Sequence, residues 1–321
     1  MSASTTLPRP RTEDELRDLG FGSVVSRESR QRLLNRDGSF NVTRQGLHFW
    51  SSLSPYQAML TMSWTKFFTI VGTSYLLVNA AFACAYLLCG PEAIVDTANV
   101  HSQPGFLRAF FFSVQTFATI GYGHIAPSGL AANLVVTLES LVGLLGFALA
   151  TGLLFSRFSR PSARILYSKS AVVAPYRGIT GFEFRVINQR KSQLIELQAK
   201  VVLARFENIN GGMQRRYYVL PLERNQVAFF PLSWTIVHPI DESSPLYQLT
   251  YQDLLHSSAE FLVLLTGIDE TFSQTVHSRS SYTADEVVWD ARFGNLFERS
   301  SDAQSLKVDI ERFHAIERVR G

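Results

Sequence analysis

Two long apolar stretches with a shorter one between them constrain the fold of this chain more than any other feature. Residues 67–88 carry no charged side chain, and residues 128–156 carry one, Glu139. A helix over the first stretch would rise about 33 Å, enough to cross the apolar core of a bilayer. Buried helices of soluble proteins rarely run so long without a charge. The two stretches therefore predict membrane-spanning helices.

The apolar stretch between them, residues 106–118, is only 13 residues long and too short to span. A short apolar helix in this position is typical of a re-entrant segment, whose backbone is tolerated at membrane depth only inside protein or beside water. The partial negative charge at its C-terminal end would favour a cation there. We therefore expect a half-helix that leads into the residues after it.

Those residues, 119–123, read Thr-Ile-Gly-Tyr-Gly. Gly121 and Gly123 tolerate positive φ angles, which suits an extended loop whose carbonyls all point one way. Rings of such carbonyls, one loop from each of four subunits, replace the hydration shell of K⁺. Tyr122 is expected to brace the loop outward against Phe111 and Phe112. An ordinary turn can have the same five-residue sequence, but a turn would not be expected between a half-helix and a spanning helix. The order of spanning helix, half-helix, loop and second spanning helix predicts a potassium selectivity filter made of Thr119, Ile120, Gly121, Tyr122 and Gly123.

Charged residues beside the spans indicate the topology. Lys66 precedes the first span, and Arg157, Arg160 and Arg164 follow the second, so the positive-inside rule places both termini in the cytoplasm. Residues 51–65 have apolar positions at near-helical spacing and a tryptophan close to the lysine, which predicts a helix on the membrane surface.

From residue 161 onward, short alternating runs are separated by turn signals, a pattern typical of an all-β sandwich. The expected fold class is membrane α plus β: two transmembrane helices with a re-entrant pore helix and selectivity filter, followed by a cytoplasmic β-sandwich. The first span begins too far along the chain for a cleaved signal peptide. The predicted organisation is an N-terminal cytoplasmic segment over 1–50, an interfacial helix over 51–65, a pore domain over 66–157 and the sandwich over 158–321.

The composition fits a membrane part joined to a globular part, with 46% hydrophobic and 18% charged residues. A net charge of +3 without a dense basic run indicates no nucleic-acid partner. Cys84 and Cys89 lie within an apolar stretch and are expected to pack in a helix. No catalytic motif is present, so we expect no enzyme, no metal beyond K⁺ and no cofactor beyond the permeant K⁺ ions.

Residues 113–118, which lead into the filter motif, resemble the pore of inward-rectifier potassium channels, especially the prokaryotic (KirBac-type) branch. Residues 188–196, 237–247 and 279–282 are similar to stretches of that family's cytoplasmic immunoglobulin-like domain. The resemblance implies a homotetrameric, multi-pass channel in the cytoplasmic (inner) membrane of a bacterium.

The resemblance also implies roles in the second span. Phe155 matches the hydrophobic constriction where the family's spans cross, a gate that closes by dewetting; a lipid-facing side chain is the alternative. Gly143 is a candidate hinge, whereas Gly146 and Gly152 are expected to serve close packing. Phe147 is expected to line the pore where strongly rectifying relatives have an acid that holds Mg²⁺ or polyamines. Block at that position is therefore not expected.

Glu139 is the one charge in a spanning helix, and such carboxylates usually face a cavity or a partner. We expect it either behind the filter or along the wet, pore-lining side of the helix. Eukaryotic relatives have an acid in the pore helix and a basic residue just past the filter, where this chain has Gln115 and Ile125. That ion pair is absent, and Glu139 with Gln115 is expected to replace it by hydrogen bonding.

By resemblance, Glu196 and Glu270 match acids of the cytoplasmic vestibule, where rings of carboxylates concentrate cations. The plain alternative is a solvated strand face, with Ile195 and Leu197 on the opposite face.

The three arginines Arg157, Arg160 and Arg164 match part of the family's anionic-lipid site. Their alternative role is to set topology alone, because two further basic positions of that site are Ser162 and Ala163 here. The expected partners are the lipid bilayer and anionic lipids, with phosphoinositide as an inhibitor.

Two other functions fit parts of the sequence. A membrane-anchored β-sandwich binding protein would need the spans but not the half-helix and filter motif. A nonselective cation channel would not need an intact filter.

Overall fold

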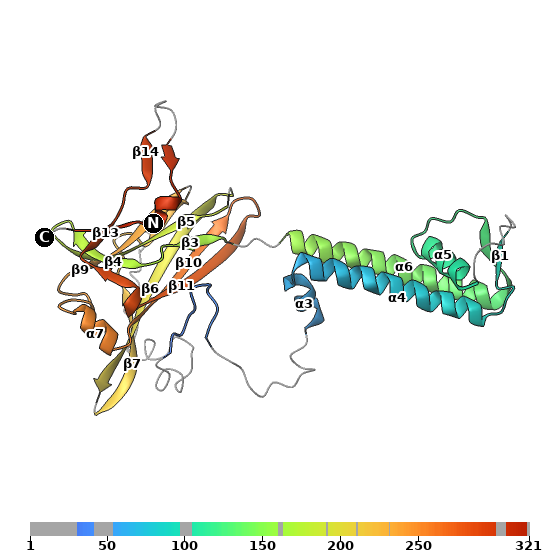
Figure 1. Ribbon diagram of the computed structural model, residues 1–321, viewed down its shortest axis with the longest axis horizontal. Helices are drawn as coiled ribbons and strands as arrows, with labels where there is room; N and C mark the ends of the chain where they lie inside the picture. The colour runs from blue at the N-terminus through green and yellow to red at the C-terminus, as the bar shows by residue number, and fades with distance from the viewer. Residues whose placement is uncertain are drawn as a thin grey trace, which may run out of the picture. The chain divides into compact units, whose positions relative to one another are not determined.

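The computed structural model describes residues 31–41, 54–96, 105–159, 163–190, 192–209, 211–230, 232–299 and 306–319. The chain divides into two compact units, each described here by itself (Figure 1). One unit is Gln45–Arg160 and is mainly helical where it is described. The other combines Met1–Arg44 with Pro161–Gly321 and consists mainly of strands. The helical unit is therefore inserted between two parts of the β unit.

Two long helices dominate the helical unit, α4 (Trp64–Leu88) and α6 (Gly129–Phe158). They have 25 and 30 residues, and the most apolar 18-residue windows of the two helices have mean hydropathies of 1.6 and 2.0. Only 17% and 11% of their most apolar windows are buried within the protomer. Core helices of a soluble protein would have these faces covered, so this outward apolar surface fits helices that cross a membrane.

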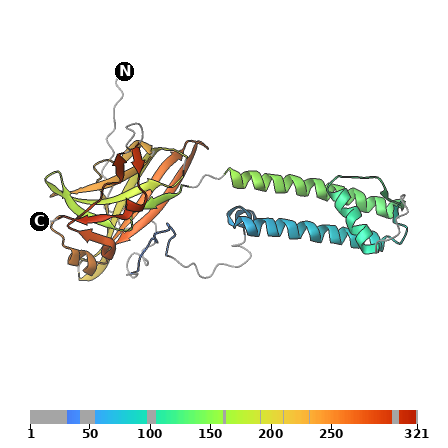
Figure 2. The same cartoon turned by 45° about the horizontal axis from the view of Figure 1, so that its top comes forward.

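Two short helices complete this unit. The first is α3 (Pro55–Thr61), which begins at a proline whose fixed φ and missing N–H suit a first helical turn. The second is α5 (Gly105–Phe117), which packs against both long helices (Figure 2). Strand β1 (Ile94–Asp96) pairs with β2 (Ile125–Pro127), so the chain segments before and after α5 are tied together.

Side chains of α4, α5 and β1 form the buried core around α5, and partly buried Val135 and Val136 of α6 pack against it. The buried members are Ala83, Tyr86, Ile94, Ala109 and Phe112. The rings of Tyr86 and Phe112 meet edge to face with centroids 5.1 Å apart, a favourable aromatic geometry. This packing fixes the half-helix against α4.

The β unit is a sandwich of two five-stranded sheets. The first has the order β11-β10-β6-β7, with β8 also pairing with β6, and the second has the order β12-β4-β5-β3, with β9 also pairing with β5. The first sheet contains β6 (Leu194–Ile209), β7 (Gly212–Leu220), β8 (Gln226–Phe230), β10 (Glu260–Asp269) and β11 (Gln274–Thr283). The second contains β3 (Ile165–Tyr167), β4 (Ala171–Tyr176), β5 (Ile179–Asn188), β9 (Ser233–Ile240) and β12 (Val287–Trp289).

Aromatic packing joins the two sheets. Phe182 of β5 stacks on Phe261 of β10 with ring centroids 4.1 Å apart, and both are buried. The smaller elements are α7 (Tyr251–His256), η2 (Ala284–Glu286), η3 (Glu311–His314), and the strand pairs β13 (Ala291–Phe293) with β16 (Ile316–Arg318) and β14 (Phe297–Arg299) with β15 (Leu306–Val308). The predicted fold class, two spanning helices with a half-helix followed by a β-sandwich, is confirmed.

One detail of strand β6 differs from the prediction. Its pairing with β10 shifts by one residue opposite Gly267, and Glu196 has a positive φ of 51°. Because this bulge inserts an extra residue, Leu194 and Leu197 are both buried, and Ile195 is not on the face of Leu197. The predicted strict alternation through Ile195 is therefore wrong.

Candidate functional site

The loop after α5 has an alternating backbone. Thr119, Gly121 and Gly123 have φ angles of 53°, 58° and 82°, whereas Ile120 and Tyr122 between them do not have positive φ. Alternation of left-handed and ordinary residues turns successive peptide groups to the same side, so N–H groups face one way and carbonyls the other. The loop leaves the helix through a bond from the Ile120 N–H to the Gln115 carbonyl at 2.8 Å. All five loop residues are exposed in the protomer.

Tyr122 does not make the predicted contact within its own protomer. Its ring lies 6.1 Å from that of His124, and it is 69% exposed. Phe112 instead packs on Tyr86, and Phe111 pairs with Phe110. Phe112 of the half-helix thus packs on α4, and the Tyr122 ring lies on the surface of the protomer.

Glu139 is fully buried at the contact of α6 with α4 and α5. Its carboxyl group bonds the hydroxyl groups of Tyr86 and Ser113. The prediction that Glu139 lines the pore is wrong, because α4 and α5 cover it in the protomer. The alternative position behind the filter stays a prediction. The predicted partnership with Gln115 is also not observed.

Gly143 is buried one turn after Glu139 on α6. A Cβ atom at this position would lie 2.6 Å from the carbonyl oxygen of Phe117, the last residue of α5. At Gly146 the nearest atom would be 3.5 Å away, and at Gly152 nothing lies within 4 Å. The close packing expected at Gly146 and Gly152 is therefore found at Gly143, the residue predicted as a hinge.

Phe147 and Phe155 lie on the surface of α6 and are 75% and 72% exposed. No side chain of the described part of the protomer covers these rings. Both remain available to a partner subunit or to lipid, so the predicted roles in the pore and gate stay predictions.

Arg157 is engaged inside the helical unit. Its guanidinium donates to the carbonyls of Met59 and Met62, at 2.7 Å for Met62, and lies over the rings of Trp64 and Phe67 at 4.4 and 4.7 Å. It therefore satisfies carbonyls at the C-terminal end of α3. These carbonyls take up both terminal nitrogens of Arg157, and its predicted lipid role stays a prediction. Arg164 is exposed, and Arg160 lies outside the described residues.

Glu196 and Glu270 are both exposed at one end of the first sheet. The Glu270 N–H donates to the Gln193 carbonyl at 3.1 Å, and Asp269 pairs with Leu194, so the two acids belong to neighbouring strand ends. Cys84 and Cys89 are free thiols.

Sequence reasoning missed the way residues 31–41 bind the sandwich. The backbone N–H groups of Leu33 and Leu34 donate to the two oxygens of Glu260, at 2.8 and 3.0 Å. Both leucines are buried against Val202, Ala204, Tyr217 and Leu262. The only signal in the sequence was an acid, Glu260, directly before the apolar run of β10. Its position does not indicate which residues it binds.

Two arginines of the same segment pair with Glu286. Arg36 Nε and Arg32 Nη1 lie 2.8 and 3.1 Å from Glu286 Oε1. Burial alone would raise the pKa of Glu286, but the hydrogen bonds from Arg36, the Thr283 N–H and Arg32 together hold it below its usual value. The carboxylate is therefore ionised at neutral pH and anchors both cations.

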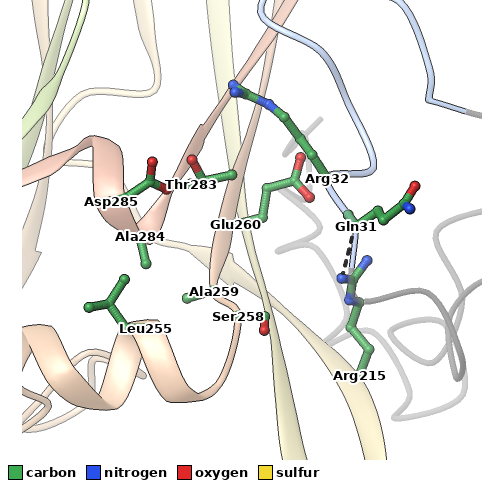
Figure 3. A pocket seen from close by; sticks show the side chains of 10 residues that line it. All are labelled: Gln31, Arg32, Arg215, Leu255, Ser258, Ala259, Glu260, Thr283, Ala284 and Asp285. Atoms are coloured by element: carbon green, nitrogen blue, oxygen red, sulfur yellow. Dashed lines mark hydrogen bonds between the residues drawn. The ribbon is translucent and has the colours of Figure 1, made fainter.

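A cavity of about 210 Å³ lies beside this segment (Figure 3). Arg215 lines it, is 5% exposed, and donates to the Gln31 carbonyl at 3.4 Å. Its guanidinium lies 4.7 Å above the Phe206 ring, and burial lowers its pKa. Figure 3 shows Gln31 and Arg32 of the N-terminal segment beside Glu260 and Arg215 of the sandwich, so the cavity belongs to the attachment of that segment.

Two spanning helices, a half-helix ending in an exposed loop of alternating backbone, and a β-sandwich define the chain as a pore-loop channel subunit. The comparisons with known proteins give the particular family. Residues 165–321 match the inward rectifier potassium channel C-terminal domain, and residues 73–160 match the ion channel family.

Individual relatives agree. The chain is 44% identical over 298 residues to the inward rectifier potassium channel Kirbac3.1 of Paramagnetospirillum magnetotacticum, covering 92% of this chain and 99% of that protein. It is 27% identical to irk-1 of Caenorhabditis elegans, over 91% and 58% of the two chains, and 29% identical to inward rectifier potassium channel 18 of Homo sapiens, over 92% and 73%. The chain belongs to the inward rectifier potassium channel family.

The resemblance predicted from the sequence is therefore confirmed. The chain is a membrane protein with a channel function and not an enzyme. Both the helical part and the sandwich match channel families, which leaves no feature that favours a membrane-anchored binding protein.

Proposed function

We propose that four copies of this chain form a K⁺-selective pore in which residues 119–123 of each copy contribute one quarter of the filter. The observation that carries this proposal is the alternating backbone of the loop, with positive φ at Thr119, Gly121 and Gly123. Such a loop directs its carbonyls to one side, and four loops would surround a dehydrated K⁺ ion. The exposure of all five residues in the protomer supports assembly with partners.

Ion flux into liposomes that contain the purified protein tests this proposal. We expect uptake of K⁺ and of its tracer Rb⁺ to exceed Na⁺ uptake greatly, and Ba²⁺ to block it. Equal Na⁺ and Rb⁺ uptake would contradict a selective filter. A limiting size other than four subunits at complete cross-linking would contradict the tetramer.

We propose that Phe155 forms the hydrophobic gate, since its exposed ring lies three residues before the end of α6. Replacing Phe155 with alanine should raise basal Rb⁺ flux by about three- to tenfold, because a wider constriction stays hydrated. Phe147→Ala is the matched control, an equally exposed aromatic two turns earlier on the same helix. Unchanged flux in folded Phe155→Ala tetramers, or equal increases in both variants, would argue against a gate at Phe155.

The remaining roles concern the surroundings of the pore. We place the channel in the cytoplasmic membrane of a bacterium with both termini in the cytoplasm, on the charges that flank the spans. Arg157, Arg160 and Arg164 are the residues proposed to bind anionic lipid, with phosphoinositide as an inhibitor. Glu196 and Glu270 are proposed to concentrate cations along the cytoplasmic part of the path.

A further inference from the structure

Four polar side chains meet inside the helical unit, and we call them the polar cluster. Asn79 and Tyr86 come from α4, Ser113 from α5 and Glu139 from α6, and each is at most 1% exposed. The Tyr86 hydroxyl donates to Glu139 Oε2, and Ser113 Oγ lies within hydrogen-bond distance of Glu139 Oε1. One carboxyl group therefore joins three helices.

The hydrogens of the polar cluster can be counted. Asn79 Nδ2 donates to the Tyr75 carbonyl at 2.7 Å, so the amide oxygen is the atom that faces Ser113 Oγ, at 3.0 Å. Exchanging the two amide atoms would set that oxygen against the Tyr75 carbonyl, which only accepts. Ser113 thus has two neighbouring acceptors, Asn79 and Glu139, but a single hydrogen. With an ionised Glu139, one of these two contacts would lack a hydrogen.

We propose that Glu139 is a neutral carboxylic acid whose proton completes the polar cluster and thereby positions the pore helix α5. Glu139 Oε1–H donates to Ser113, Ser113 donates to Asn79, and Tyr86 donates to Glu139 Oε2. Each contact then has one donor and one acceptor. No cation is among the hydrogen-bond partners of Glu139 in the described part of the chain, and a buried carboxylate without a cation is strongly unfavourable.

The contact between Glu139 and Ser113 holds α5 against α6, and a close backbone contact lies one helical turn further along both helices. Gly143 follows Glu139 by four residues and lies against the backbone of Phe117, which follows Ser113 by four residues. Phe117 is two residues before Thr119, so any shift of α5 would displace the loop. Glu139 is therefore a positioning residue, and this part of the inference rests on the proposed filter.

Infrared spectroscopy tests the protonation state without any conduction. In the purified protein at neutral pH, we expect a C=O stretching band of a protonated carboxyl group that is lost in Glu139→Gln. Glu242→Gln, which changes an exposed acid, should leave this band unchanged. Absence of the band from the wild type, or its persistence in Glu139→Gln, would overturn the neutral acid.

Flux measurements test the positioning role. Glutamine has an N–H that donates to Ser113 and an oxygen that accepts from Tyr86, so Glu139→Gln should keep the Rb⁺ to Na⁺ flux ratio within about twofold of the wild type. Glu139→Leu has a similar volume but makes neither bond, and we expect the ratio to fall about tenfold or more. Ser113→Ala removes only the central hydroxyl and should lower the ratio in the same direction, so it replaces the leucine variant if that does not fold.

A wild-type ratio in folded Glu139→Leu or Ser113→Ala would overturn the positioning role, as would a Glu139→Gln variant as damaged as Glu139→Leu. A wild-type protein that does not discriminate K⁺ from Na⁺ would refute the proposed filter instead. The infrared result would still decide whether Glu139 is neutral.

Discussion

Gly143→Ala is expected to lower K⁺ flux at least about tenfold, because the added methyl group would overlap backbone that cannot move alone. Its Cβ would lie 2.6 Å from the Phe117 oxygen and 3.3 Å from the Phe117 carbonyl carbon. No rotamer change relieves a contact with backbone, so α5 or α6 must shift. Since Phe117 is two residues before the loop of residues 119–123, the shift would disturb the geometry of that loop. Rb⁺ and Na⁺ uptake into liposomes, with thermal unfolding of the purified protein, measures the effect.

Two other glycines of α6 serve as controls. Gly152→Ala meets nothing within 4 Å and should retain flux, with stability unchanged or slightly raised by the better helix propensity of alanine. Gly146→Ala makes an ordinary contact at 3.5 Å with the Phe117 ring and should have a small effect. If Gly143 served only as a hinge, Gly143→Ala would change how often the channel opens but not its selectivity or stability, and that result would refute the packing role.

Glu260→Ala is expected to release residues 31–41 from the sandwich. The substitution removes the acceptor of two buried N–H groups, those of Leu33 and Leu34, and an unsatisfied buried group costs about 1–3 kcal/mol. It also removes a carboxylate whose charge favours the buried Arg215 guanidinium, so that charge would be less compensated. We expect a loss of about 2–4 kcal/mol in the free energy of unfolding. Denaturant unfolding of the full chain measures the loss, and limited proteolysis near residue 35 reports the release.

Glu270→Ala is the matched control, since Glu270 is exposed and lies in the turn after the strand that begins with Glu260. It should leave both readouts unchanged. Glu260→Gln keeps one acceptor oxygen and should fall between Glu260→Ala and the wild type. Equal stability of Glu260→Ala and Glu270→Ala would show that the segment is held by its leucine side chains alone.

Hydropathy and local motifs were sufficient to predict the helices around the pore and the loop between them. A long apolar run predicts a helix with an apolar surface that faces lipid. The glycines of the loop predict positive φ angles in its backbone. The partners of Glu139 were not predictable, because Ser113 and Tyr86 lie 26 and 53 residues away and neither has an unusual local pattern. A buried carboxyl group selects its partners by three-dimensional packing, which periodicity does not encode.

The role of Arg157 shows the same limit. A cation after a spanning helix predicts topology and lipid contact equally well from the sequence. In the folded chain, two free carbonyls at the end of α3 and two aromatic rings lie within reach of its guanidinium and occupy it. The bulge at Glu196 was also hidden, because one inserted residue changes strand register without changing composition.

The attachment of residues 31–41 orders events during synthesis of the chain. These residues leave the ribosome before either spanning helix, yet their binding partners Glu260 and Glu286 are translated more than 200 residues later. Domains usually fold as units during synthesis, but the N-terminal part of this one must wait until the residues around Glu260 and Glu286 have emerged. Insertion of the helical unit into the bilayer therefore precedes closure of the β unit, and a truncated translation product would reach the membrane with its N-terminal segment undocked.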